Sequence, residues 1–362
     1  MSLGRSPGTS RYSYASTTVR GGRRDAQRAA AKLVNQASDG QVAMSADTLG
    51  ELLNRWLTHL EGLGRAPKTV VEHRRMAAEV REGIGWIKLR KLRGADLDAF
   101  YSHLREKGLS PSSVRRYHAV LSAALHQAVR WGLLERSPAV QATPPPVPVT
   151  EPACPTPDEV RQLIELAATH DAQLSALLFV AASTGCRRGE LCGLRWSDVD
   201  LETGQLVIRR AISDVPGQLE VRTTKTGRAR RMAIDPATVA ILQTQRARAE
   251  LTSGAVSSSL DADAYVWSQS PDHREPWRPG RVTAAFIRVR EEAGLSSIRL
   301  HHLRHFSASV MLAGGVDVRT TAGRLGHSQP AVTLKTYAHV MEASDRDAAM
   351  IVGLSIAEPY AE

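Results

Sequence analysis

Residues 184 to 200 read TGCRRGELCGLRWSDVD, and this stretch lies where the sequence pattern changes from helical to strand-like. Before it, Thr156-Pro157-Asp158-Glu159 forms a capping box with proline at the first helical position, followed by apolar residues at helical spacing. Helical patterns resume at Asp235-Pro236 and dominate to about Gly353. This half of the chain is therefore predicted to be an α-rich domain spanning 156–362.

Short apolar runs follow the quoted stretch and predict three strands. The three runs are residues 205–208, 219–222 and 231–234. A turn at Thr226-Gly227 is expected to join the last two strands. The predicted fold class is mainly α, with one small three-stranded antiparallel sheet.

A proline-rich segment precedes this domain. Eight of the 18 prolines fall between Pro138 and Pro157. Because proline fixes φ and removes a backbone donor, residues 138–155 are predicted to form an extended, semi-rigid linker between two domains.

The region 46–137 is predicted to be a small helical domain. Its first helix has Asp47 as the expected N-cap and six apolar residues at helical spacing. These six are Leu49, Leu52, Leu53, Trp56, Leu57 and Leu60. Further helices are expected at 67–80, 95–107 and 111–131, and the last of them opens with Ser110 as N-cap and Pro111 at the first helical position.

The first 45 residues give weaker signals. Tyr12 to Val19 are compatible with a strand or hairpin, and Arg23 to Val34 with a short basic helix.

Charge and composition restrict the class of protein. The net charge is +10, with +5 in residues 1–40, +6 in residues 46–137 and −1 in residues 138–362, so a polyanionic partner is expected for the N-terminal part. The three cysteines have no paired spacing, which argues against a disulfide framework and a thiolate metal site. No apolar run approaches the roughly 20 residues that span a bilayer, and no signal peptide is recognisable, so a soluble cytoplasmic protein is expected.

A second motif near the C-terminus ends in a tyrosine. His301-His302-Leu303-Arg304 precedes the run LGHSQPAVTLKTY, which spans 325–337 and ends at Tyr337. A phenol has a pKa of about 10, so it is a poor nucleophile at neutral pH unless its neighbours stabilise the phenolate or remove its proton. Arginine and histidine side chains from this motif, together with Arg187, are suited to that task.

The segment 184–200 resembles the first conserved box of the tyrosine recombinases, the phage integrase family, and the segment from His301 to Tyr337 resembles the second. The resemblance covers residues 155 to 355, and the helical domain before them is similar to the family's core-binding (SAM-like) domain. It implies a site-specific DNA recombinase, or integrase, that cuts and rejoins DNA through a 3′-phosphotyrosine intermediate and a Holliday junction. Such an enzyme would integrate or excise a mobile element.

The resemblance also implies catalytic roles. Arg187 and Arg304 would bind the two non-bridging phosphate oxygens, because planar guanidinium groups suit bidentate binding of such oxygens. Tyr337 would be the nucleophile, and His301 would contact the phosphate and assist removal of the phenolic proton.

Three further residues match family positions. Lys225 is similar to the family's β-hairpin lysine, which protonates the leaving 5′ oxygen. Its neighbours Arg228, Arg230 and Arg231 leave open the alternative that Lys225 is one of several exposed hairpin cations. His327 would donate a further hydrogen bond to the phosphate.

Glu190, three residues after Arg187, is expected to hold Arg187 or His301 in place. No metal and no other cofactor is implied, because the two arginines take over the charge stabilisation that Mg²⁺ supplies in many phosphoryl-transfer enzymes. Cys186 and Cys192 are interpreted as small core residues.

The implied partner is double-stranded DNA carrying attachment-type sites, bound by a homotetramer, and an accessory directionality factor is compatible with this reading. The arginines predicted to contact DNA are Arg74, Arg75, Arg115, Arg116 and Arg130. Residues 341–354 are expected to form an amphipathic helix, which in this family packs on a neighbouring protomer. The expected location is the bacterial cytoplasm, in association with the nucleoid.

Two alternatives remain open from the sequence. One is a type IB topoisomerase, which nicks and reseals a single duplex. The other is a DNA-binding protein with an inactive catalytic fold. Residues 12–34 resemble the later part of an arm-binding domain. Residues 1–45 are interpreted as a shortened segment of that kind, with arm-site binding left open, and the alternative is that the sequence starts inside a longer arm domain.

Overall fold

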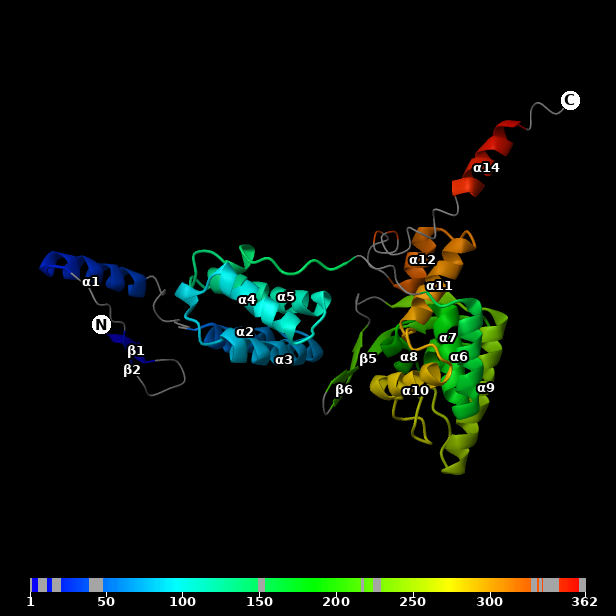
Figure 1. Cartoon of the computed structure of the whole chain (residues 1–362). Coiled ribbons are helices and arrows are strands. Elements are labelled where there is room, and N and C mark those ends of the chain that lie inside the picture. Colours follow the sequence, from blue (N-terminus) through cyan, green and yellow to red (C-terminus); the bar gives the residue numbers. More distant parts are fainter. Residues whose placement is uncertain are drawn as a thin grey trace. The chain divides into compact units, whose positions relative to one another are not determined.

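The computed structural model describes residues 2–5, 12–14, 21–38, 48–148, 154–215, 218–223, 229–326, 331, 334 and 345–357. The chain divides into two compact units, Met1–Val149 and Thr150–Glu362 (Figure 1). Within the described ranges, no helix is long and apolar enough to cross a membrane.

The first unit begins with two short strands and a helix. β1 (Ser2–Arg5) pairs antiparallel with β2 (Tyr12–Tyr14), and α1 follows at Arg23–Ser38. The predicted strand at Tyr12 and the basic helix from Arg23 are confirmed. The prediction missed β1, whose four residues include one apolar side chain and a glycine and therefore carry a weak strand signal.

Four α-helices, together with the short 3₁₀ helices η1 (Leu89–Lys91) and η2 (Pro138–Val140), form the rest of the described part of this unit. The α-helices are α2 (Leu49–Gly62), α3 (Pro67–Ile84), α4 (Gly94–Glu106) and α5 (Pro111–Arg130). α5 begins as predicted, because Ser110 Oγ accepts the backbone N–H of Ser113 at 3.2 Å and Pro111 occupies the first turn.

The predicted N-cap of α2 was wrong. The cap is Thr48, whose Oγ1 accepts the backbone N–H of Glu51 at 3.3 Å, while the Glu51 carboxylate accepts the backbone N–H of Thr48 at 3.1 Å. This reciprocal capping box satisfies two donors at the helix end, and the sequence has Gly50, which lacks a side chain, three positions after Asp47.

The four helices enclose one hydrophobic core. All six apolar residues predicted for the first helix are buried, with at most 9% of their surface exposed. Across the core, Phe100 and Tyr117 meet edge to face with ring centroids 6.2 Å apart. The apolar face of α2 therefore packs into the core, as the sequence predicted.

The second unit is mainly helical. Its helices are α6 (Pro157–His170), α7 (Ala172–Thr184), α8 (Arg188–Cys192), α9 (Pro236–Ala255), α10 (Pro279–Glu292), α11 (His302–Ala313), α12 (Val318–Leu325) and α14 (Asp345–Ala357). The capping box of α6 is confirmed. Thr156 Oγ1 accepts a hydrogen bond from the backbone N–H of Glu159 at 3.2 Å, and Glu159 Oε2 accepts one from the backbone N–H of Thr156 at 2.7 Å. Cys186 and Cys192 are buried, as predicted.

A three-stranded antiparallel sheet accompanies these helices, as predicted, but one of its strands was assigned wrongly. The sheet has the order β3 (Val199–Asp200), β4 (Gln205–Ile208), β7 (Arg230–Ala233). The predicted strand at 219–222 belongs instead to β6 (Gln218–Thr223), which pairs with β5 (Arg210–Val215) in a separate two-stranded sheet.

Pairing partners explain this error. Leu206 lies opposite Met232 in the three-stranded sheet, and Ile212 lies opposite Val221 in the two-stranded sheet. The three predicted runs are therefore strands, but the run at 219–222 was matched to the wrong neighbour. β5 was missed because it opens with Arg210 and contains polar residues in its second half. The predicted turn at Thr226-Gly227 lies outside the described residues.

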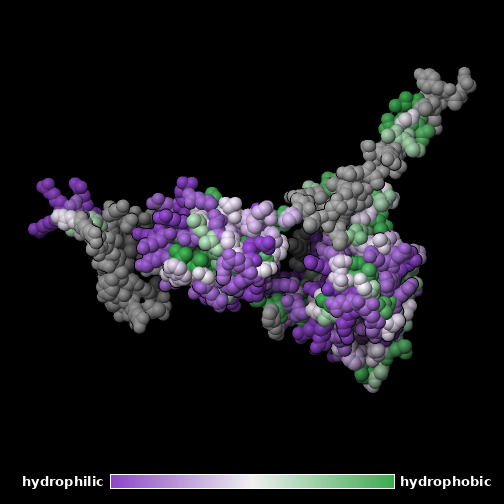
Figure 2. All heavy atoms as spheres, viewed as in Figure 1, coloured by the Kyte–Doolittle hydropathy of each residue, from purple (hydrophilic) through white to green (hydrophobic). Residues whose placement is uncertain are grey.

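On the face shown in Figure 2, both units are largely hydrophilic, whereas α14 exposes several apolar side chains. Its Met350, Val352, Leu354 and Ile356 are 58–65% exposed. A helix that exposes several apolar side chains together is typical of an interaction site. This helix was predicted at 341–354, and the structure describes it from Asp345.

Candidate active site

Arg187 lies in the turn between α7 and α8. α7 ends at Thr184, and Gly185 closes it with a left-handed φ of 64°. A Cβ on Gly185 would lie 2.6 Å from Leu325 Cδ2, so glycine allows α7 and α12 to approach closely. The turn makes Arg187 the N-cap residue of α8 and leaves 29% of its side chain exposed.

Glu190 anchors Arg187 from inside the protein. Its side chain is 1% exposed, and its Oε1 accepts from Arg187 Nη1 at 2.9 Å while Oε2 accepts the backbone N–H of Arg187 at 2.9 Å. Burial alone would raise the pKa of Glu190, but the hydrogen bonds and positive charges of Arg230 and Arg187 outweigh burial and lower that pKa. The carboxylate therefore stays ionised and fixes the direction of the Arg187 guanidinium.

Arg304 approaches the same turn from α11. It is 4% exposed, and its Nη1 donates to the Gly185 carbonyl oxygen at 2.8 Å. Its Nη2 is buried and has no hydrogen-bond partner within the described part of the chain. Burial, followed by the positive charge of Arg187, lowers the pKa of Arg304 to about 10, so the group remains cationic at neutral pH.

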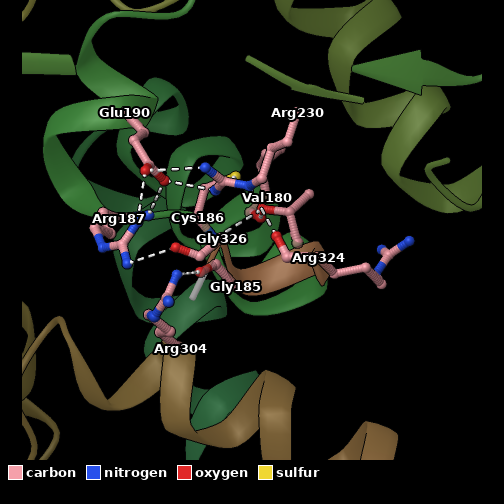
Figure 3. Close-up of polar contacts among 10 residues, drawn as sticks. Val180, Gly185, Cys186, Arg187, Glu190, Arg230, Arg304, Arg324 and Gly326 are labelled. Atoms are coloured by element: carbon pink, nitrogen blue, oxygen red, sulfur yellow. Dashed lines mark hydrogen bonds and ion pairs between the residues drawn. The ribbon is translucent and has the colours of Figure 1, made fainter. Parts of the chain in front are cut away.

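The last turn of α12 completes the arrangement (Figure 3). Gly326 ends this helix with a left-handed φ of 66°, and its carbonyl oxygen accepts from Arg187 Nη2 at 3.1 Å. Segments near residues 185, 304 and 326 are thus tied together by arginine side chains that donate to backbone carbonyls.

His301 is the residue that precedes α11, one turn before Arg304. Desolvation, followed by the positive charges of Arg304 and Arg187, lowers the pKa of His301. Its ring meets that of His305 edge to face, with centroids 5.1 Å apart. Burial and the two neighbouring histidines, His301 and His302, lower the pKa of His305 to about 4. The imidazole of His301 is therefore neutral at neutral pH and able to accept a proton.

The structure brings Arg187, Glu190, His301 and Arg304 together from two distant segments of the chain. Lys225, His327 and Tyr337 lie outside the described residues.

Arg230 at the start of β7 is a member of this cluster that the sequence did not predict. It was considered only as one of the exposed cations near Lys225, but its side chain is 13% exposed and its Nη2 donates to Glu190 Oε2 at 2.6 Å. Strand alternation could have found it, because Met232, two residues later, is buried on the same side of β7.

The five arginines predicted to contact DNA are exposed on α3 and α5. Glu72 on α3 accepts from Arg75 at 3.0 Å and from Arg116 on α5 at 2.9 Å, so it holds these two guanidinium groups side by side across two helices. Arg74 pairs with Glu61.

Within the ranges that the structure describes, no group of three or more His, Cys, Asp or Glu side chains is arranged to hold a metal ion.

Comparison with known families and sequences gives a consistent result. Residues 155–344 match the model of the phage integrase family. A tyrosine recombinase XerC-like protein from Caldanaerobacter subterraneus subsp. tengcongensis is 26% identical over 316 residues, which cover 81% of this chain and 80% of that protein. The ICEBs1 integrase of Bacillus subtilis is 26% identical over 264 residues, with 72% of this chain and 70% of that protein covered.

Solved structures share the fold. The Tn1549 transposon integrase in complex with transposon right end DNA superposes with a TM-score of 0.68 at 17% identity, covering 84% of this chain and 99% of that one. A lambda integrase tetramer bound to a Holliday junction gives a TM-score of 0.63 at 20% identity, covering 92% and 90% of the two chains.

Proposed function

We propose that this chain, which belongs to the phage integrase family, cuts and rejoins DNA through a covalent 3′-phosphotyrosine intermediate and a Holliday junction. The chain is a tyrosine recombinase that binds DNA and acts in DNA recombination. Its likeness to the ICEBs1 integrase supports a role in integrating or excising a mobile element.

The observation that carries the proposal is that Arg304 and Arg187, two cations that repel each other, lie close together in one site. A buried cationic donor without an acceptor is costly, and Arg304 Nη2 is such a donor within the described part of the chain. The non-bridging oxygens of a phosphodiester are suitable acceptors, and they gain negative charge as phosphorus becomes five-coordinate. Arg187, already oriented by Glu190, would bind the second oxygen.

Tyr337 is the proposed nucleophile. Its phenolic oxygen attacks phosphorus in line, the bond to the 5′ oxygen breaks, and the 3′ phosphate is left esterified to the tyrosine. His301, neutral because its pKa is lowered, accepts the phenolic proton. Lys225 gives a proton to the departing 5′ oxygen, and His327 donates a hydrogen bond to the phosphate. Because the ester conserves the bond energy, the 5′ hydroxyl of a partner strand reverses the attack without ATP.

DNA binding is divided between regions of the chain in this proposal. Residues 46–137 bind the core site, residues 156–362 carry out catalysis, residues 138–155 link them, and residues 1–45 belong to an arm-binding segment. The exposed arginines of α3 and α5 contact the phosphate backbone, with Glu72 aligning Arg75 and Arg116 for this purpose.

The proposed active assembly is a homotetramer on two duplexes with attachment-type sites. The lambda integrase tetramer bound to a Holliday junction supports this by likeness of fold. The exposed apolar side chains of α14 suit packing on a neighbouring protomer. An accessory factor that sets the direction of recombination would act on this assembly.

Covalent trapping tests the proposal. Full-length protein is mixed with a pool of nicked duplexes whose core is randomised, and complexes that survive detergent are collected. Wild-type protein should trap DNA, and Tyr337→Phe should bind DNA yet trap none. Equal trapping by the variant would overturn the mechanism. Relaxation of supercoiled DNA that lacks paired sites would instead favour a type IB topoisomerase.

A further inference from the structure

Arg230 donates hydrogen bonds to three neighbours at once. Its Nη1 and Nη2 donate to the two oxygens of Glu190 at 3.0 and 2.6 Å, and Nη2 also contacts Cys186 Sγ at 3.6 Å. Its Nε donates to the carbonyl oxygen of Arg324 at 2.9 Å. Because a guanidinium group is planar and its donors point in fixed directions, these bonds hold α8 and α12 in one relative position.

Both oxygens of Glu190 are shared between Arg187 and Arg230 (Figure 3). Oε1 accepts from Nη1 of each arginine, at 2.9 Å from Arg187 and 3.0 Å from Arg230. Oε2 accepts the backbone N–H of Arg187 at 2.9 Å and Nη2 of Arg230 at 2.6 Å. The carboxylate cannot move away from Arg230 without displacing Arg187 as well.

The end of α12 is held by the same two arginines. Arg187 binds the Gly326 carbonyl and Arg230 binds the Arg324 carbonyl, two acceptors at a helix end where intrahelical donors run out. The Gly326 backbone also packs directly on Arg230, because a Cβ there would lie 2.9 Å from Arg230 Nη1. His327 is the next residue of the chain.

We propose that Arg230 is a positioning residue for DNA cleavage: through Glu190 it fixes the Arg187 guanidinium, and through the Arg324 carbonyl it fixes the end of α12 from which the chain continues to His327. This inference rests on the proposed function, because it concerns the same site. Four of the five guanidinium N–H groups of Arg230 donate to Arg324, Glu190 and Cys186, so its influence on the phosphate is assigned to these neighbours.

The test measures the single-turnover rate of covalent complex formation by the full chain. The substrate is the duplex that the wild-type protein enriches from the nicked, randomised pool. Arg230→Gln is expected to slow the reaction by about 10–100-fold, by analogy with groups that orient metal-binding side chains, with unchanged DNA affinity in gel-shift titrations. Arg230→Lys restores a cation opposite Glu190 and should recover part of the rate. Arg231→Gln, at the exposed neighbouring position on β7, should keep the wild-type rate.

A double variant separates positioning from folding. Glu190→Gln combined with Arg230→Gln removes both buried charges of this pair, and the Arg187 cation that loses its carboxylate is 29% exposed, so the double variant is expected to fold. If Arg230 acts through Glu190, its substitution should slow the Glu190→Gln protein by much less than it slows the wild type. If the rate reductions of the two single variants multiply in the double variant, Arg230 does not act through Glu190.

Failure of the inference and failure of the proposed function give different results. If wild-type protein traps DNA, Tyr337→Phe does not, and Arg230→Gln reacts at the wild-type rate, the inference is wrong and the function stands. If the wild-type protein traps no duplex of the pool, or if Tyr337→Phe traps it equally, the proposed function itself is wrong. Circular dichroism of each variant checks folding, and the Arg230→Lys and double variants decide the case if Arg230→Gln does not fold.

Discussion

The carbonyl oxygen of Gly326 accepts a hydrogen bond from Arg187 Nη2 at 3.1 Å, although 139 residues separate the two in sequence. This bond ties the turn after α7 to the last turn of α12. The position of Arg187 and the start of the Gly326-His327 segment are therefore not independent of each other. A change at one of them is expected to affect the other.

Gly326→Ala should destabilise the protein. Its φ of 66° disfavours a Cβ, and that Cβ would meet Arg230 Nη1 at 2.9 Å, so we expect a loss of at least about 1–2 kcal/mol in the free energy of unfolding. The matched control is Gly323→Ala in α12, where a Cβ meets nothing within 4 Å and helix propensity should add about 0.5–1 kcal/mol of stability. Denaturant unfolding of both variants measures the difference, and equal effects would contradict this account.

Stability should fall on acidification because of Glu190. Its folded-state pKa lies below the ordinary value of 4.5, so the ionised carboxylate stabilises the folded protein above the unfolded-state pKa. That contribution is lost as the pH falls through the lowered folded-state pKa. We expect the melting temperature of the wild type to decline more steeply in this acidic window than that of Glu190→Gln. Parallel curves for the two proteins would argue against an ionised Glu190.

The pH dependence of cleavage should report on His301. Its pKa is lowered from the ordinary 6.5 by desolvation, followed by the charges of Arg304, Arg187 and His302, and only the neutral imidazole accepts the tyrosine proton. The single-turnover cleavage rate is therefore expected to decrease in acidic solution with a midpoint below pH 6.5. His301→Gln should be slower and should lack this decrease. An acid limb with its midpoint at or above 6.5 would count against His301 as the proton acceptor.

Arg116 should contribute to DNA affinity through a phosphate contact. It is exposed on α5 and held next to Arg75 by Glu72. Arg116→Gln is expected to reduce the slope of log affinity against log salt concentration by about 0.9, the value for one lost contact with duplex DNA. Fluorescence anisotropy at several salt concentrations measures it, with Arg161→Gln on α6, 69% exposed, as the control. An unchanged slope for Arg116→Gln would remove this residue from the interface.

Helix ends and buried helix faces were predictable because their signals are local. The Thr156 capping box and the Ser110-Pro111 start of α5 depend on residues within one turn, and both occur as predicted. The prediction of Asp47 as N-cap was wrong by one position, because Glu51 stands three residues after Thr48 and completes its capping box. The residues that carry the family resemblance, Arg187 and Arg304, were also identified by their local motifs.

Strand pairing was not predictable in the same way. The runs at 205–208, 219–222 and 231–234 all form strands, but their partners depend on contacts between distant parts of the chain. Pattern alone does not say that β4 pairs with β7 while β6 pairs with β5, since each run has enough apolar residues to suit either neighbour.

The sequence by itself therefore determined the helical framework, the strand-forming runs and the catalytic candidates, because propensity, capping and motif spacing act within a few residues. Tertiary structure alone decided that Arg230 meets Glu190, because strand alternation puts Arg230 and Arg231 on opposite faces of β7 but does not identify the carboxylate that either face meets. Adjacent residues on a strand point to opposite faces, and which face meets a buried carboxylate depends on how β7 packs against α8 and α12. The same packing brings the Gly185 and Gly326 carbonyls within reach of Arg304 and Arg187, a relationship that separation in sequence conceals.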